Sequence, residues 1–200
     1  TGTPEGLNIY DPNSSTFKPF NEHSEGISLS DKFITALWED YKGDIWIGTS
    51  SRVIKFCRKD SSLFHYNKDE GLPGDLVYSI IEDNSNRIWF ATGNGLCSFQ
   101  PSDSKCKNYS LEDGLQSLEF NMGASFKSSD GEIFLGGMNG FNSFYPDSIT
   151  FNSYIPEPEF TSVYKITEGK REELYTEGSD NIVLFHDDHS FTVEFSALEF

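Results

Sequence analysis

Ile45-Trp46-Ile47-Gly48-Thr49 decides the fold, because the chain repeats this short apolar stretch twice more. It returns as Ile88-Trp89-Phe90-Ala91-Thr92 and again as Ile133-Phe134-Leu135-Gly136-Gly137, first 43 and then 45 residues further along. A period of about 40 to 45 residues, built on strand-like apolar runs, is typical of the four-stranded blades of a β-propeller. The sequence therefore predicts an all-β protein built from propeller blades.

The residues around each copy supply the other strands of a blade, separated by turns rich in Gly, Asp and Asn. The flanking strands of the first two copies are predicted at 32–40, 52–56, 62–66, 76–83, 95–99 and 105–109. The third copy has strands at 119–127, 132–136 and 140–145 but no fourth, and residues 6–12 and 16–20 match the last two strands of a blade. We therefore predict a partial propeller of about three blades over residues 1–146.

The number of blades is smaller than a ring needs, since propellers close with about four to eight blades. The repeated strands are apolar on both faces, so each expects a neighbouring blade on either side. We expect residues 1–146 to be the last blades of a larger propeller, beginning halfway through one blade, or to complete a ring by association.

The character of the sequence changes after Pro146. Residues 147–158 contain Pro156 and Pro158 and are predicted to be a linker. Residues 159–166 then alternate with period two, as a half-buried strand does. Further strands are predicted at 181–185 and 190–195, with residues 167–179 as a polar loop. Residues 159–200 are therefore predicted to begin a β-sandwich that stops before its remaining strands.

The composition restricts the partners of the chain. It carries 32 acidic against 15 basic residues, a formal net charge of −17, which repels phosphate backbones and anionic membrane surfaces. We therefore expect no nucleic-acid partner. No run reaches the roughly 18 apolar residues that a membrane-spanning helix needs, so any membrane segment is expected outside these 200 residues.

The three cysteines, Cys57, Cys97 and Cys106, form no C-x-x-C pair, which argues against a zinc site. Cys97 and Cys106 fall on neighbouring predicted strands of one repeat, so a disulfide between them is one alternative. Two small buried thiols are the other alternative, and the one that we favour.

Carboxylate pairs recur at Glu39-Asp40 and Glu82-Asp83. Glycosidases need two carboxylates across a cleft, but a pair that precedes the same turn in each repeat is better explained by Asp capping of that turn. His186 and His189 flank two aspartates in a short turn, where four ligands rarely converge on one ion. No nucleophile or phosphate-binding motif occurs. We expect no catalytic residue, metal site or cofactor.

A binding face is the better expectation. In a propeller the connections between strands two and three and between successive blades emerge on one face, and loops on a rigid scaffold carry recognition. Amide, carboxylate, guanidinium and aromatic groups gather there, a mixture suited to hydroxyl-rich ligands such as sugars. The candidate ligand contacts are Arg52, Asp75, Tyr78, Asn94, Glu119, Asn121 and Asn139.

The repeat resembles the two-component regulator propeller repeat, on the residues of Tyr41–Thr49, Gly95–Phe99 and Glu70-Gly71-Leu72-Pro73. Residues 119–146 look like the last blade of such an array, and Ser190–Phe200 is similar to the start of the three-tyrosine, immunoglobulin-like domain that follows it. The departures from the pattern are Phe134 for Trp, Ala91 for Gly and Arg52 for Gly.

The resemblance implies the periplasmic sensor region of a Bacteroidetes hybrid two-component regulator. Such a region detects oligosaccharides released from polysaccharides and relays the signal through a membrane helix to a cytoplasmic histidine kinase that controls transcription. It implies three partners: an oligosaccharide, the remaining blades of the same protein, and a second copy bound through the sandwich domain. The region itself is expected to be non-catalytic. The alternatives are a propeller polysaccharide lyase or glycosidase, and an interaction scaffold.

Overall fold

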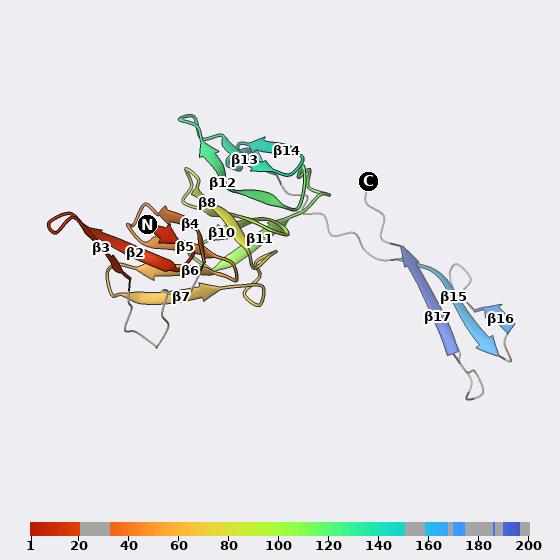
Figure 1. The fold of residues 1–200 in the computed structure, drawn as a ribbon. Coiled ribbons are helices and arrows are strands. Elements are labelled where there is room, and N and C mark those ends of the chain that lie inside the picture. Colours follow the sequence, from red (N-terminus) through yellow and green to blue (C-terminus); the bar gives the residue numbers. More distant parts are fainter. Residues whose placement is uncertain (21–32, 151–158, 168–169, 175–185, 187–189, 197–200) are drawn as a thin grey trace. The chain divides into compact units, whose positions relative to one another are not determined.

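The computed structural model describes residues 1–20, 33–150, 159–167, 170–174, 186 and 190–196 (Figure 1). The chain divides into two units, Thr1–Thr150 and Phe151–Phe200. Apart from one 3-10 turn, η2 (Pro146–Ser148), the part of the chain that the structure describes contains only strands and loops. The prediction of an all-β fold is confirmed.

The first unit contains two complete four-stranded antiparallel blades, each with its strands side by side in chain order. Blade one consists of β4 (Ile34–Glu39), β5 (Ile45–Thr49), β6 (Val53–Cys57) and β7 (Ser62–Tyr66). Blade two consists of β8 (Val77–Glu82), β9 (Ile88–Thr92), β10 (Gly95–Gln100) and β11 (Lys105–Tyr109).

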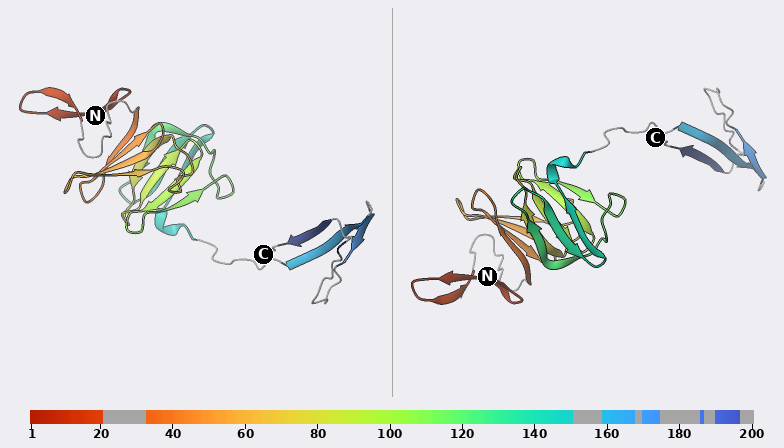
Figure 2. Two further views of the ribbon diagram at one scale, coloured as in Figure 1. Left: turned by 90° about the horizontal axis from the view of Figure 1, so that it is seen from below. Right: turned by 90° about the horizontal axis from the view of Figure 1, so that it is seen from above.

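Two three-stranded sheets flank these blades (Figures 1 and 2). Blade three consists of β12 (Phe120–Lys127), β13 (Ile133–Gly137) and β14 (Gly140–Phe144). The N-terminal part-blade consists of β1 (Gly2–Thr3), β2 (Gly6–Asp11) and β3 (Thr16–Pro19). The two-residue strand β1 was not predicted, because a pair of residues carries no hydrophobic pattern.

The three copies of the repeated stretch are β5, β9 and β13, each the second strand of its blade. The side chains of β9 are buried on both faces of the sheet, and Trp46 of β5 is fully buried. A strand covered on both faces has no reason to alternate between apolar and polar residues. The repeated apolar run is therefore a packing element between blades.

Apolar side chains from adjacent blades interdigitate in three separate cores. The part-blade packs on blade one, blade one on blade two, and blade two on blade three. The main contributors, in that order, are Leu7, Phe20, Ile47 and Ile54; Trp46, Val53, Phe90 and Phe99; and Ile81, Trp89, Ile133 and Leu135. Burying each such side chain contributes about 1.5 to 3 kcal/mol, so contacts between blades hold this unit together.

Cys97 and Cys106 form a disulfide between β10 and β11, with Cα atoms 5.8 Å apart. Our preference for two free thiols was therefore wrong. Cys97 lies opposite Asn108 and Cys106 lies opposite Phe99, so the two cysteines are diagonal neighbours on one face of the sheet. The Cα separation falls in the ordinary range for a disulfide, but this register could not be read from the spacing alone.

The described part of the second unit is one antiparallel sheet in the order β16-β15-β17. It consists of β15 (Glu159–Thr167), β16 (Lys170–Glu173) and β17 (Ser190–Ser196). Strand β16 falls in the stretch 167–179 that we predicted to be a loop, so that prediction was wrong. Its four side chains are all exposed, and an exposed edge strand carries charges without any alternating pattern. The Arg171 guanidinium lies 3.6 Å from the centre of the Tyr164 ring and pairs with Glu194 at 2.7 Å.

Several predictions fall outside the described residues. They concern residues 151–158 of the predicted linker 147–158, the strand at 181–185, the residues after Ser196, and His189 of the His-Asp-Asp-His turn.

Candidate ligand-binding face

The loops between strands two and three of a blade, and the connections between successive blades, lie together along one rim of the first unit. We call this rim the recognition rim. The loop between β9 and β10 bonds to both neighbouring connections: Gly93 N donates to Leu76 O at 3.0 Å and Gly95 N to Leu118 O at 2.7 Å. In the next blade Met138 N donates to Glu119 O at 3.3 Å. These backbone bonds hold the rim loops in fixed positions.

A β-bulge interrupts the first strand of every blade at this rim. In blades one and two one extra residue, Thr35 or Tyr78, lies between successive paired residues. In blade three, four residues over 121–124 lie opposite Gly136 alone. A bulge leaves its extra residue outside the ladder and redirects its side chain, and bulges are common at binding sites. The candidates Tyr78 and Asn121 thus occupy the same position in adjacent blades.

Tyr78 and Glu119 form a direct contact between blades two and three. The Tyr78 hydroxyl donates to Glu119 Oε1 at 3.0 Å. Burial, together with the neighbouring carboxylate, raises the pKa of Tyr78, so the phenol stays protonated and remains a donor at neutral pH. Tyr78 is half-buried and Glu119 is exposed, so a ring and a carboxylate face solvent side by side.

The three asparagine candidates use their side-chain N–H groups within the protein. Asn94 Nδ2 donates to Pro73 O at 3.0 Å, and Asn121 Nδ2 donates to Gly137 O at 3.2 Å. Asn139 Nδ2 donates to Gln116 O at 3.2 Å. These amides shape the rim loops.

Arg52 and Asp75 lie at the same rim, but Asp75 forms an exposed ion pair whereas the Nε atom of Arg52 is buried. The Asp75 carboxylate pairs with Lys68 at 3.3 Å, and both side chains are largely exposed. Such an exposed pair contributes little to stability. The Arg52 carbonyl accepts hydrogen bonds from the backbone and hydroxyl of Thr49, and its side-chain Nε is buried without a hydrogen bond to any described residue.

Sequence reasoning missed two polar residues of the rim, Thr35 and Gln116. Thr35 Oγ1 and Gln116 Nε2 are buried and have no hydrogen-bond partner among the residues that the structure describes. The repeat aligns 34–40 with 77–83 and so places Thr35 at the position of Tyr78, but Thr35 was not predicted as a ligand contact. Gln116 accepts from Asn139 N at 2.7 Å and lies against Gly137 so closely that no side chain fits there. No repeat pattern reports that contact.

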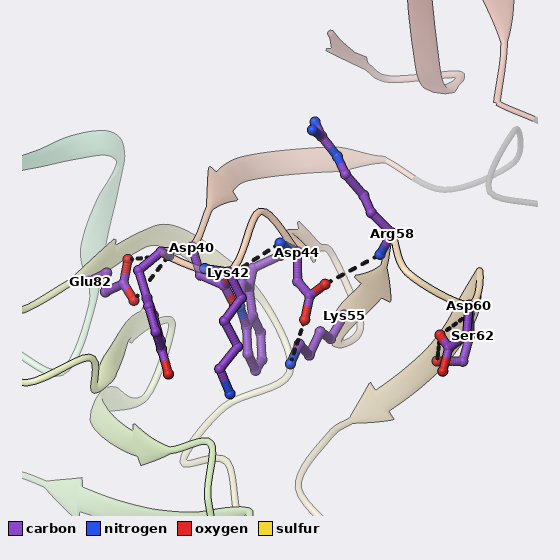
Figure 3. A network of polar contacts seen from close by, with 10 residues as sticks. Asp40, Lys42, Asp44, Lys55, Arg58, Asp60, Ser62 and Glu82 are labelled. Atoms are coloured by element: carbon purple, nitrogen blue, oxygen red, sulfur yellow. Dashed lines mark hydrogen bonds and ion pairs between the residues drawn. The ribbon is translucent and has the colours of Figure 1, made fainter.

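At the opposite rim, the aspartate of each carboxylate pair closes a turn, which confirms the turn interpretation. Asp40 Oδ1 accepts from Lys42 N at 2.9 Å and Asp44 N at 3.0 Å, while Oδ2 accepts from the indole of Trp46 at 2.9 Å (Figure 3). The carboxylate therefore satisfies both the turn and a buried indole N–H.

Blade two repeats this arrangement, and blade three departs from it. Asp83 accepts from two turn N–H groups and from Trp89 Nε1 at 2.9 Å. In blade three Ser128 stands in place of the aspartate, and Phe134 stands in place of the tryptophan. Phenylalanine has no N–H, so a buried acceptor is not needed there.

The glutamate of the second pair links two blades. Glu82 Oε2 accepts from Tyr41 N of blade one at 3.1 Å (Figure 3). Burial raises the pKa of Glu82. Its counterpart Glu39 is exposed and pairs with Arg58 at 3.3 Å. Both carboxylate pairs, Glu39-Asp40 and Glu82-Asp83, are thus engaged in hydrogen bonds or ion pairs within the protein.

The sequence of the two complete blades matches a known family. Residues 28–51 and 71–94 each match the two-component regulator propeller repeat. Blades one and two carry two-component regulator propeller repeats. Each match includes the bulged first strand, the Asp turn and the repeated second strand of its blade, and ends in the loop that follows the second strand. These repeats therefore include the bulge residues Thr35 and Tyr78.

Solved structures share the fold that these repeats form. The extracellular domain of the hybrid two-component system BT3049 from B. thetaiotaomicron aligns with a TM-score of 0.75 and 24% identity, over 98% of this chain and 27% of that one. The extracellular domain of BT4673 from the same organism aligns with a TM-score of 0.58 and 18% identity, over 86% of this chain and 24% of that one. The chain thus spans about a quarter of the length of these structures.

A search of curated proteins returned no significant match. Within the described residues, no helix has the length and apolar character that crossing a membrane requires.

Proposed function

We propose that this chain is part of the extracytoplasmic sensor of a hybrid two-component regulator, and that it binds polysaccharide-derived oligosaccharides at the recognition rim. The Tyr78–Glu119 contact carries the proposal. It places an aromatic ring and a carboxylate, from two different blades, at the solvent edge of rigid bulged strands. Sugars present apolar ring faces and hydroxyl donors, which such a pair can stack against and bind. The regulator-type repeats of both blades support the assignment.

Binding is proposed to act on the bond between Tyr78 and Glu119. A sugar hydroxyl that donates to Glu119 competes with the Tyr78 hydroxyl and leaves the ring to stack on the sugar. Because Tyr78 belongs to blade two and Glu119 lies at the start of blade three, ligand binding changes a contact between blades. This change is the proposed first step of signalling.

The proposed compartment is the periplasm, outside the inner membrane. The Cys97–Cys106 disulfide supports this proposal, because disulfides persist in oxidising compartments and are rare in the cytosol.

The proposed role is binding without catalysis, with kinase activity in another region and with dimerisation through the second unit. Asp40 and Asp83 support the absence of glycosidase chemistry in the turns, since their carboxylates are occupied by backbone and indole N–H groups. The dimer is proposed from the family resemblance alone. Analytical ultracentrifugation of the full extracytoplasmic region tests it, and a monomer at high micromolar concentration would contradict it.

Calorimetric titration of the chain, and of the full extracytoplasmic region, with a panel of plant and host glycan oligosaccharides tests the binding proposal. For a ligand that binds, Tyr78→Ala is expected to weaken affinity about tenfold or more, as loss of a central aromatic contact does. Tyr41→Ala is the matched control, because Tyr41 is an exposed tyrosine at the opposite rim, and less than about twofold change is expected.

Two outcomes would contradict the proposal. Unchanged affinity in Tyr78→Ala would exclude the recognition rim, and conversion of an oligosaccharide to products would favour the enzyme alternative.

We also propose that a further blade of the same protein covers the outer face of blade three. Phe126, Phe134 and Phe141 form an aromatic row on that face, and Phe126 and Phe141 are 63% and 65% exposed. In blade two the equivalent positions are buried against blade three, and they are occupied by Ile81, Trp89 and Leu96. The face that blade three leaves open is therefore the same face that blade two uses to bind a blade.

The N-terminal part-blade shows the matching feature at the other end of the unit. Tyr10 and Phe17 are about half exposed, with ring centres 5.1 Å apart. The equivalent residues of blade one, Phe56 and Leu63, pack against the part-blade. Hydroxyl-radical footprinting of the full extracytoplasmic region is expected to show Tyr10 and Phe141 protected, and strong labelling of either residue would contradict the proposal.

A further inference from the structure

The chain leaves blade three through a short segment, residues 145–149, which we call the exit segment. The segment forms the turn η2 (Pro146–Ser148) at the position where a complete blade has the connection between its third and fourth strands. The Tyr145 hydroxyl donates to Asp130 Oδ2 at 2.9 Å, and Ile149 packs against the core between blades two and three. The exit segment is therefore attached to the first unit beyond its last strand.

Asp147 attaches the exit segment to blade two. Its Oδ1 atom accepts from Arg87 at 2.6 Å and from the Ser85 hydroxyl at 3.0 Å. Both donors belong to the connection between β8 and β9, some 60 residues earlier in the chain. Asp147 itself is 68% exposed, so its role in packing is small.

Arg87 connects this exposed carboxylate to the interior of blade two. Its Nε donates at 2.6 Å to Asp83 Oδ2, the same oxygen that accepts from the Trp89 indole, and the Asp83 side chain is only 1% exposed. A guanidinium holds two carboxylates at fixed angles because its donors are coplanar. The exit segment is thus bonded, through one arginine, to the buried turn of blade two.

The repeat itself does not require this arginine. The residue of blade one equivalent to Arg87 is Asp44, which pairs with Lys55 at 3.0 Å within its own sheet. The Asp40 turn makes the same backbone and indole hydrogen bonds without any arginine. The side-chain contacts that Arg87 adds in blade two are those with Asp83 and with Asp147.

We propose that Arg87 and Asp147 are positioning residues that hold the exit segment on blade two, so that a shift between blades two and three moves the point at which the chain leaves blade three. This inference rests on the proposed sensor function. Tyr78 lies near the start of β8 and Asp83 directly follows its end, so one strand joins the recognition rim to the exit segment. A shift between blades two and three then moves the exit segment, because that segment is bonded to blade two. An unattached segment would not follow the shift.

Amide hydrogen exchange of the full 200-residue chain, without any ligand, tests the attachment. The Ser148 and Ile149 amides donate to Tyr145 O and Pro146 O within the exit segment. Asp147→Ala is expected to speed exchange at these two amides about five- to tenfold, since a short charged contact holds the segment closed. The thermal midpoint is expected to change little, because Asp147 is exposed. Ser85→Ala removes one of the two contacts and is expected to give a smaller increase.

Nitrogen-15 relaxation provides a second readout, within the first unit. In the wild-type chain the Ser148 and Ile149 amides are expected to be as ordered as those of β8, and in Asp147→Ala they are expected to become less ordered. Asp103→Ala is the matched control, since Asp103 is an exposed aspartate of blade two that pairs with Lys105 at 4.0 Å. Unchanged exchange, or unchanged order of the Ser148 and Ile149 amides, in Asp147→Ala would overturn the inference. Failure to find a glycan would count against the proposed function and leave this result standing.

Discussion

Blade one and blade three are built on the same repeat but satisfy it with different chemistry. Blade one has a buried tryptophan, Trp46, whose indole N–H bonds to Asp40. Blade three has Phe134 and Ser128 at the same two positions, and Ser128 Oγ accepts no ring donor but bonds to Glu132 O at 3.1 Å. The difference teaches that the aspartate and the tryptophan are one unit, present or absent together, because a buried N–H without an acceptor is costly.

The largest expected effect comes from breaking this unit in blade one. Asp40→Ala leaves the Trp46 indole and two turn N–H groups without their acceptor, and we expect it to lower the free energy of unfolding by about 2 to 4 kcal/mol. Ser128→Ala, the matched change in blade three, is expected to cost about 0.5 to 1 kcal/mol. Urea unfolding followed by tryptophan fluorescence measures both, and equal costs in the two blades would contradict the comparison.

A smaller effect is expected when blade one is converted to the chemistry of blade three. Asp40→Ser and Trp46→Phe should each destabilise the chain alone, and together they should cost less than the sum, with a coupling energy of about 1 to 2 kcal/mol. The double-mutant cycle uses the same unfolding measurement. Simple additivity of the two costs would show that the two residues act independently.

The smallest expected effect concerns the residue before the turn, which is Glu82 in blade two and Lys127 in blade three. Asp40 and Lys127 are the charged groups that face Glu82, and burial raises the pKa of Glu82. The folded state therefore binds this proton more tightly than the unfolded state, so stability falls as pH rises from about 4.5 through the raised folded pKa. Below that window the penalty is absent, and above it the penalty is fully present.

Glu82→Gln keeps an oxygen that accepts from Tyr41 N and removes the charge. We expect it to flatten this part of the stability–pH curve and to stabilise the chain at neutral pH by less than about 1 kcal/mol. The exposed Glu39 of blade one supplies the control Glu39→Gln. A wild-type curve that rises with pH across the window in parallel with Glu82→Gln would refute the expectation.

Much of the first unit could be predicted from the sequence because the second strands of its two complete blades are buried on both faces. Runs such as Ile45–Thr49 then carry the signal in composition alone, and three copies establish the repeat. The edge strand Lys170–Glu173 was missed for the opposite reason, since an exposed edge strand has neither an apolar face nor alternation. The Cys97–Cys106 disulfide depended on strand register, which the spacing of two cysteines does not determine.

The recognition rim could be predicted as a set of loops but not as a set of contacts. Tyr78 and Glu119 were both predicted as candidates from the sequence. Their hydrogen bond was not predicted, because it joins residues 41 positions apart in different blades. The three asparagines were predicted as ligand contacts, whereas in the structure their side-chain N–H groups bond to backbone carbonyls of the rim loops. Contacts with the ligand remain a prediction.

The bulge in the first strand of each complete blade has a consequence for how the rim can vary between related proteins. The ladder resumes directly after the extra residue, with Ala36 opposite Gly48 in blade one and Ser79 opposite Ala91 in blade two. Thr35 and Tyr78 thus differ in size and chemistry while the strands around them keep the same pairing. A complete blade built this way can exchange one side chain at its rim without altering the packing between blades.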